Sequence, residues 1–292
     1  MLDFRMDTLI AVCKHMNFTK AAEALNITQP AVSQHIRHLE DDYGIKIFQY
    51  DGRKMKLSAE GKALLNAAIT IKHDDLFLRE KLKEFKKEQR KLVFGTTLTI
   101  GEFVMPGRLA EYLNKNPDTS IQMIVENTNR LLEKLNNGGI DFAVIEGYFT
   151  KSEYDYLQYS RERYIPVCGP DYRCSEAAHT VEDLLGERLI VREPGSGTRE
   201  ILERILGEKN LSIQDFKNLV EISNMNAIKL LVQANCGITF LYEAAAKKEI
   251  LNGSLREIRL KEFDVSHDFT FVWRKGSMFA ERYRELFENL RE

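Results

Sequence analysis

Two short runs rich in hydroxyl and glycine residues have the composition of an anion-binding site. Residues 195–198 (GSGT) precede the helical pattern TREILERIL, and Thr97 and Thr99 follow the strand-like segment KLVFG. Glycine lets a backbone approach a ligand, and the free N–H groups and dipole of a helix N-terminus attract anions. Neither run has the lysine or the spacing of a Walker loop. Each run alone fits an ordinary turn better, but two runs facing one cleft favour a small-anion site.

A second candidate site is the polar face of a helix predicted over residues 29–43. Thr28 is a good N-cap for it, and Asn17 is one for the preceding helix, FTKAAEAL. Two helices joined by a tight turn, the second of them polar, form the helix-turn-helix pattern. A merely solvated polar face explains the same pattern. The candidate DNA contacts on this unit are Thr19, Thr28, Gln29, Pro30, Ser33, Gln34 and Arg37, because Gln suits adenine and Arg suits guanine or phosphate.

A two-stranded hairpin is predicted over residues 45–57. Apolar positions flank Asp51-Gly52, which is a strong turn signal. Arg53 and Lys54 lie at the tip, where cations can follow a phosphate backbone. The hairpin is therefore expected to be the wing of a winged helix-turn-helix domain.

A long helix is predicted over residues 59–90, which contain one glycine and no proline. Leu64, Ile71, Leu78 and Phe85 recur every seven residues along it. Such a seam packs either against its own domain or against a partner helix. The heptad spacing favours dimerisation.

The remaining residues, 91–292, alternate predicted strands and helices, a pattern typical of a parallel α/β sheet. Two halves of similar size predict two lobes with a ligand cleft between them. We expect a DNA-binding domain over residues 1–58, a linker helix over 59–90 and a ligand-binding domain over 91–292. Within the last, lobe I spans about 91–164 and 268–292, and lobe II spans about 165–267.

The composition narrows the class of protein. The chain has 292 residues, of which 43% are apolar and 29% charged, and a formal charge of −2, which excludes a disordered chain and a polycation. Residues 1–91 nevertheless hold 17 Lys and Arg against 13 Asp and Glu. No signal peptide and no apolar run of membrane-spanning length is seen, so we expect a cytoplasmic protein with reduced cysteines. A redox switch between Cys168 and Cys174 is the alternative.

The chain resembles the LysR-type transcriptional regulators over its whole length. The resemblance is carried by AVCKHMNFTKAAEALNITQPAVSQHIRHLEDDYGIKIF and GRKMKLSAEGKALL. It implies a winged helix-turn-helix, a long linker helix and a two-lobed α/β effector domain like that of periplasmic binding proteins. It also implies a homodimer or homotetramer that binds double-stranded DNA and can contact RNA polymerase. Tyr50 stands where the family usually has an Arg, whereas Arg53 is kept.

The segments TTLTIGEFVMP and REPGSGTRE resemble effector loops of one branch of this family. That branch includes regulators of sulfur and carbon assimilation, which respond to small inorganic anions or to phosphorylated and carboxylated metabolites. The resemblance implies a pocket lined by Thr97, Thr99, Ser196, Gly197 and Thr198, with Asn127, Thr128 and Glu146 as further candidates. Glu146 is a hinge or a proton-dependent contact, because an ionised carboxylate repels an anion. No cofactor or metal is expected.

Two other classes of protein remain as alternatives. A solute-binding or transport-associated protein would share the two lobes, but residues 1–62 argue against it. An enzyme would need a catalytic constellation, and the sequence contains no GxSxG, HExxH or CxxC motif. We therefore expect a regulator rather than an enzyme.

Overall fold

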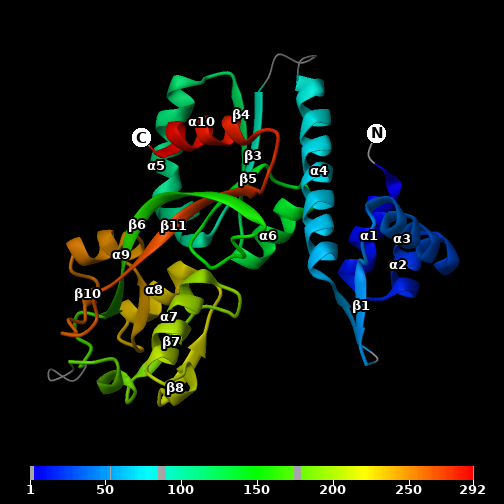
Figure 1. The fold of residues 1–292 in the computed structure, drawn as a ribbon. Coiled ribbons are helices and arrows are strands. Elements are labelled where there is room, and N and C mark those ends of the chain that lie inside the picture. The colour runs from blue at the N-terminus through cyan, green and yellow to red at the C-terminus, as the bar shows by residue number, and fades with distance from the viewer. Residues whose placement is uncertain (1–2, 53, 85–89, 174–178, 292) are drawn as a thin grey trace.

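The computed structural model describes residues 3–52, 54–84, 90–173 and 179–291. Three parts follow one another in Figure 1: a small helical domain with a hairpin, one long helix, and a larger α/β body. Among the described residues, no helix combines the length and apolarity that crossing a bilayer requires.

The small N-terminal domain has the predicted winged helix-turn-helix order. Its elements are α1 (Phe4–His15), α2 (Phe18–Leu25), α3 (Gln29–Tyr43), β1 (Phe48–Asp51) and β2 (Lys54–Leu57). The predicted caps are confirmed, because the side chains of Asn17 and Thr28 accept backbone N–H groups at the starts of α2 and α3. Gly44 ends α3 with φ 64°, in the left-handed region that glycine favours. The two strands pair around Asp51 and Lys54 as an antiparallel wing.

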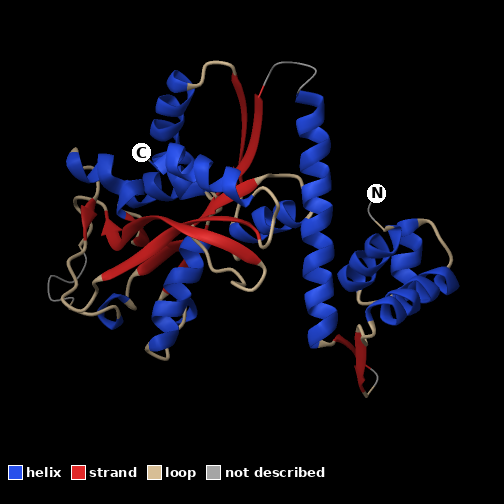
Figure 2. Ribbon diagram, turned by 45° about the horizontal axis from the view of Figure 1, so that its top comes forward, coloured by secondary structure: helices blue, strands red, loops and turns tan. Residues whose placement is uncertain are grey.

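The long helix α4 (Ala59–Glu84) runs between this domain and the α/β body (Figures 1 and 2). It is shorter than predicted, since Arg90 already belongs to strand β3 (Arg90–Thr96) and pairs with Thr119. A helix prediction from periodicity alone does not detect this change, because the strand is fixed by pairing with a segment some 30 residues away.

One seven-stranded sheet runs through the α/β body. Besides β3, its strands are β4 (Thr119–Val125), β5 (Phe142–Ile145), β6 (Tyr154–Cys168), β9 (Thr239–Tyr242), β10 (Arg256–Glu257) and β11 (Val265–Arg274). Strands β3, β4 and β5 are parallel to one another, but β11 is antiparallel to both β5 and β6. Four of the six strand pairings in this sheet are antiparallel, so the expectation of a parallel sheet is wrong for most of it.

The long strands β6 and β11 join the two lobes. Lobe I holds β3–β5 with η1 (Ile100–Val104), α5 (Met105–Lys115), α6 (Thr128–Asn136) and α10 (Ala280–Arg291). Lobe II holds η2 (Glu182–Leu184), β7 (Arg188–Val191), α7 (Gly197–Glu208), η3 (Ile213–Asp215), β8 (Asn218–Glu221), α8 (Met225–Gln233) and α9 (Glu243–Leu251). Figure 2 shows helices on either side of the red strands. Trp273 of β11 packs against Tyr283 of α10, with ring centroids 6.0 Å apart.

Candidate ligand and nucleic-acid sites

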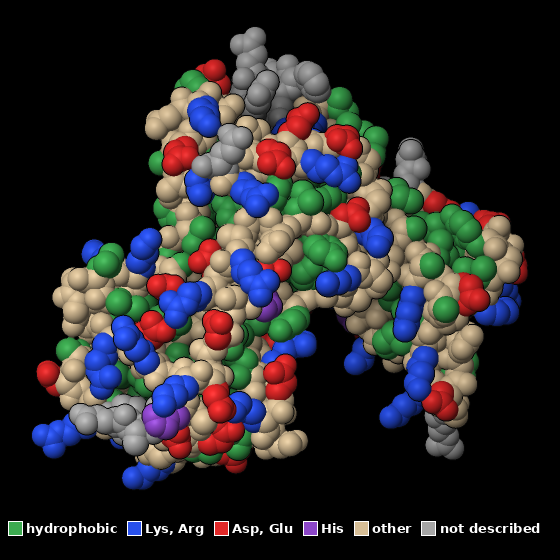
Figure 3. Space-filling model, turned by 60° about the vertical axis from the view of Figure 1, so that its left-hand side comes forward, with side chains coloured by type: hydrophobic (Ala, Val, Ile, Leu, Met, Phe, Trp, Pro, Cys, Tyr) green, Lys and Arg blue, Asp and Glu red, His purple; other side chains and the backbone are tan. Residues whose placement is uncertain are grey.

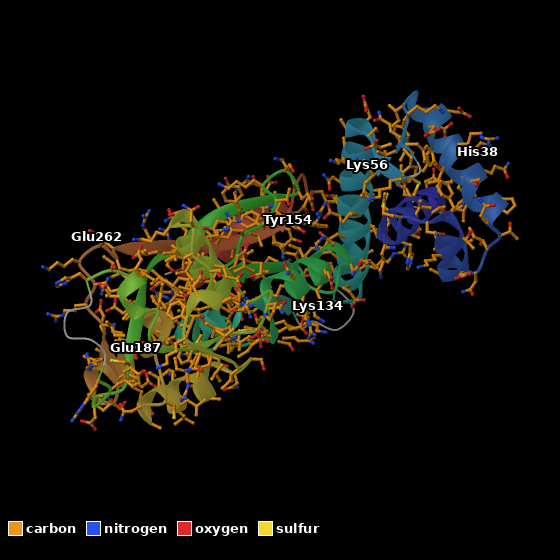
Figure 4. All side chains as sticks on the ribbon, turned by 90° about the horizontal axis from the view of Figure 1, so that it is seen from below. His38, Lys56, Lys134, Tyr154, Glu187 and Glu262 are labelled. Atoms are coloured by element: carbon orange, nitrogen blue, oxygen red, sulfur yellow. The ribbon has the colours of Figure 1, made fainter. Side chains whose placement is uncertain are left out.

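The exposed face of α3 carries polar side chains that are free to meet a ligand. Val32, Ile36 and Leu39 are buried, which turns Gln34 and Arg37 to the solvent. Within the described part of the chain, neither of these two side chains has a hydrogen-bond or ion-pair partner. In contrast, the Gln29 amide already donates to Ser33 Oγ at 2.8 Å. Figure 4 places His38 on this outer domain, far from the α/β body.

The segment that leads into the wing is bound to the last turn of α3 by the carboxylate of Glu40. Glu40 accepts a hydrogen bond from the Ile47 backbone N–H at 2.9 Å and one from Lys46 Nζ at 2.8 Å. Lys54 and Tyr50 are exposed on the wing, whereas Lys56 is paired with Asp51 at 2.7 Å. Lys and Arg side chains lie beside the grey tip of the wing in Figure 3. The predicted contact Arg53 lies outside the described residues.

Thr19 and Pro30, the other predicted DNA contacts, lie on the same domain and are exposed. Thr19 is in the first turn of α2, and Pro30 is in the first turn of α3, beside the Thr28 cap. The N-termini of both helices therefore carry exposed polar groups of the kind that hold phosphates.

The predicted seam on α4 is only partly available to a partner. Leu64 is 8% exposed and belongs to the core of the winged domain. Its predicted role in dimerisation is therefore wrong. Ile71 and Leu78 are 51% and 39% exposed, and Leu82 is 55% exposed. Phe85 lies outside the described residues. The heptad spacing did not reveal that α1 packs over the first turns of α4.

Another face of α4 is docked on lobe I through buried polar groups that the sequence analysis missed. Asp74 accepts hydrogen bonds from Ser277 Oγ at 2.6 Å and from the Met278 N–H at 2.8 Å. The fully buried Arg274 donates from Nη2 to the Asn66 carbonyl at 3.2 Å. The polar run KHDD inside an otherwise apolar repeat was the available signal for this contact.

Lobe I contributes a cluster of buried hydroxyl groups at the ends of its parallel strands. Thr97 and Thr99 follow β3, and Thr128 begins α6 after its N-cap Asn127. All three threonine side chains are buried. The hydroxyls of Thr97 and Thr128 have no hydrogen-bond partner among the described residues. A buried polar atom without a partner is uncommon and marks a place where a ligand or water binds.

Lobe II meets this cluster with the first turn of α7. Ser196 is the N-cap of α7, but its buried hydroxyl makes no cap hydrogen bond. Thr198 Oγ1 lies 3.5 Å from Thr99 Oγ1 and donates to Glu146 Oε1 at 2.7 Å. The structure thus brings the two predicted loops together, and the Thr198 backbone N–H is directed at Glu146 in the junction.

Glu146 lies at the centre of the junction and is fully buried. Burial raises the pKa of its carboxyl, while hydrogen bonds from the Thr198 and Thr99 hydroxyls and the charge of Arg192 lower it. Gly197 packs directly on it, since a Cβ at Gly197 would lie 2.6 Å from Glu146 Cγ. Glycine is therefore required at this contact between the lobes.

Two residues of this site were missed in the sequence analysis. The Tyr164 hydroxyl on β6 donates to the Thr198 carbonyl at 2.8 Å. Arg192 follows β7, and its buried guanidinium pairs with Glu193 at 2.9 Å. A charged residue directly after the apolar run LIV was a signal for Arg192, whereas nothing local marks Tyr164.

The two lobes are in direct contact at the site, through Thr198 with Thr99 and Glu146. A cavity of about 10 Å³, about what one water requires, lies on the lobe II side of this contact, beside Thr198 and Arg192. Further contacts hold the lobes together, including Lys229 Nζ of α8, 4.3 Å from the Phe103 ring centre. A hollow of about 690 Å³ lies elsewhere, between α4 and β3, and its lining residues flank the undescribed segment 85–89.

Among the described residues, the cysteines form no disulfide bond and no metal-binding cluster is found. Cys168 is buried and forms no disulfide bond with another described cysteine, and Cys174 lies outside the described residues. Across the described ranges, no group of three His, Cys, Asp or Glu side chains is arranged to hold a metal ion.

Comparisons with known proteins agree with this architecture. Residues 5–62 match the family "Bacterial regulatory helix-turn-helix protein, lysR family", and residues 86–292 match the "LysR substrate binding domain". The chain is 25% identical over 276 residues to the regulator CysL of Bacillus subtilis, covering 91% of this chain and 89% of CysL. It is 27% identical over 277 residues to the activator CmpR of Synechocystis, covering 94% and 90%.

A solved structure shares the fold of the α/β body. The regulatory domain of Synechocystis CcmR, determined in complex with 2-PG, matches with a TM-score of 0.61 at 18% identity, covering 70% of this chain and 96% of that domain. The winged domain, the linker helix and the two-lobed body, together with both family matches, show that this chain belongs to the LysR family of transcriptional regulators.

Proposed function

We propose that a small anionic effector binds between the two lobes and thereby controls how the protein binds DNA. The observation that carries this proposal is the convergence of unpartnered buried groups from both lobes. Thr97 and Thr128 belong to lobe I, and Ser196 belongs to lobe II at the start of α7. Hydroxyl donors at a helix N-terminus favour an oxyanion, and contact with both lobes gives the ligand different affinities for open and closed arrangements.

The effector contacts that we propose follow from the same geometry. They are Thr97, Thr99, Asn127, Thr128, Glu146, Ser196, Gly197 and Thr198. Asn127 belongs to this set because its amide lies near Gly195, 3.7 Å from the position of a Cβ there. A carboxylate or phosphorylated metabolite is the ligand class, in line with the 2-PG-bound CcmR domain.

Calorimetry with a panel of sulfate, phosphate, phosphoglycolate and carboxylates tests the site. Ser196→Ala and Thr198→Val should each weaken binding by about tenfold or more, because a hydrogen bond to a charged group is worth about 1.5–3 kcal/mol. Thr150→Val removes an exposed hydroxyl in lobe I and should leave the affinity unchanged. A panel that gives no heat with the wild-type protein would rule the anion site out.

We propose further that α3 enters the major groove of double-stranded DNA while the wing follows the backbone. Gln29, Ser33, Gln34 and Arg37 would face the bases. Thr19, Thr28, Pro30, Arg53 and Lys54 would lie near phosphates. The unpartnered side chains of Gln34 and Arg37 support the groove assignment, since unpaired donors are available to base edges.

The assembly that we propose is a homodimer through α4, joined into a homotetramer by the effector domains. The exposed stripe Ala67, Ile71, Leu78 and Leu82 has the four- and seven-residue spacing of a helix-pairing seam. We place the protein in the cytoplasm, where DNA and RNA polymerase are its macromolecular partners, and assign it no enzymatic activity.

A further inference from the structure

Glu146 occupies the place where an anion is expected. Thr198 is the second residue of α7, and its hydroxyl donates to Glu146 Oε1 at 2.7 Å. Its backbone N–H and the Thr99 hydroxyl are also hydrogen-bond donors toward the same carboxylate. Two of the residues that would hold an effector, Thr99 and Thr198, are therefore already engaged by a side chain of lobe I, whereas the hydroxyl of Ser196 is not.

This carboxylate is poorly compensated for a buried charge. Glu146 is 1% exposed, and its Oε2 has no hydrogen-bond partner among the described residues. Arg192 is the cation that faces it; its guanidinium pairs with Glu193 through Nε and Nη2, and Nη1 has no partner among the described residues. Tyr164 on β6 and Tyr242, the last residue of β9, are further titratable groups close enough to feel its charge. The Tyr164 hydroxyl donates to carbonyl oxygens instead.

Gly197 lies against Glu146 Cγ and confines the side chain on the side that faces α7. A second anion beside an ionised Glu146 would face an unscreened like charge in a dry site. Proton uptake removes that repulsion and also turns the carboxyl into a hydrogen-bond donor.

We propose that Glu146 is a tethered competitor for the effector: its carboxylate holds the N-terminus of α7 when no ligand is present, and an oxyanion binds there together with one proton taken up from solvent by Glu146. This inference rests on the proposed anion site. The affinity of that site for its effector then depends on pH, because binding takes up a proton. One O–H bond forms on Glu146 with the proton taken from solvent, the hydroxyls of Thr99 and Thr198 turn from the carboxyl group to the oxyanion, and no other covalent bond forms or breaks.

Sulfate is the probe, because its charge is constant between pH 6 and pH 8. Calorimetry on the full-length protein should show wild-type affinity rising by up to tenfold for each pH unit of decrease, which is the slope for uptake of one proton. Titrations in buffers of different ionisation enthalpy should confirm that uptake. Glu146→Gln keeps the shape of the side chain without its charge. It should bind sulfate at least tenfold more tightly than the wild type at pH 8, with little dependence on pH.

Glu200→Gln is the matched control. It removes one carboxylate from the first turn of α7, the helix whose N-terminus Glu146 contacts. Glu200 is partly exposed and contacts Tyr148 and Arg204 rather than Thr198. It should keep the wild-type affinity and slope. Weaker sulfate binding by Glu146→Gln, or an unchanged pH slope in that variant, would overturn the inference and leave the anion site standing. No sulfate binding by Glu146→Gln at either pH would overturn the anion site itself.

Discussion

Gly197 of lobe II lies against Glu146 of lobe I so closely that a Cβ on Gly197 would come within 2.6 Å of Glu146 Cγ and 2.8 Å of the Gly147 nitrogen. A methyl group there therefore overlaps both a side chain and the backbone. The closed arrangement of the lobes depends on the absence of this one carbon atom.

Gly197→Ala should hold the lobes apart. Because the overlap involves the Gly147 backbone, a small side-chain adjustment cannot relieve it. We expect a larger radius of gyration of the effector domain by small-angle X-ray scattering and weaker anion binding. Gly207→Ala lies on the same helix with open space around it and is the control. Identical scattering of Gly197→Ala and the wild type would show that the lobes do not close on this contact.

Arg37→Ala should relax the DNA sequence preference at one base step, at a cost of about 1–3 kcal/mol for the preferred base. Lys54→Ala should instead weaken binding to all sequences alike and lower the salt slope by about one, as expected for a phosphate contact. Binding to a panel of operator variants at several salt concentrations separates the two effects. If Arg37→Ala behaved like Lys54→Ala, Arg37 would be a backbone contact.

Ile71→Asp should break the dimer, because an unpaired charge buried in an apolar seam is strongly unfavourable. Lys62→Asp is the control. Lys62 is exposed and lies nine residues, or two and a half turns, before Ile71, which puts it on the opposite side of α4. Light scattering measures both variants. If both variants dissociated into monomers, or if neither did, the exposed stripe on α4 would not be the dimer interface.

Asp141→Asn should stabilise the protein at neutral pH. Burial raises the pKa of Asp141 to about 6, although the hydrogen bond from the Val93 N–H and the charges of His73, Lys81 and Arg282 lower it. The folded state therefore holds this proton more tightly than the unfolded state. The free energy of unfolding falls as pH rises from about 4 through about 6, by about 3 kcal/mol at most.

Thermal unfolding of Asp141→Asn at pH 4 and pH 8 measures this effect. The melting temperature should exceed that of the wild type at pH 8, and the difference should shrink at pH 4. Asp118→Asn, at an exposed position of lobe I, should change neither value. A gain of equal size at both pH values would mean that the carboxyl charge is not its cause.

The features that were predicted from the sequence are local ones. The caps at Asn17, Thr28 and Gly44 each involve residues within four positions of one another, so their residue types are sufficient evidence. The hairpin at Asp51 is equally local. The winged domain could therefore be predicted almost element by element.

The features that were missed depend on distant partners. Strand β6 has such a distant partner, because its pairing with β11 joins Tyr164 to Val265 about 100 residues later. Leu64 has the same spacing as Ile71, and nothing in that spacing shows that the winged domain covers one and not the other. At the ligand site, the loops with Thr99 and Thr198 were predicted, and Glu146 was named as a candidate. Its position between the two loops could not be predicted, because it depends on how the two lobes meet.

Because α4 is docked on lobe I, a tilt of this helix moves the winged domain. Asp74 and Arg274 tie the middle of a helix of 26 residues, about 39 Å long, to the lobe. From Asp74 to its first residue, Ala59, where the winged domain is attached, the helix is a stiff arm of about 22 Å. A tilt of about 10° about Asp74 displaces the end of that arm by about 4 Å, or about one base-pair rise along the DNA axis. Small rotations at the effector domain are therefore large enough to change which half-site spacing a pair of recognition helices can reach.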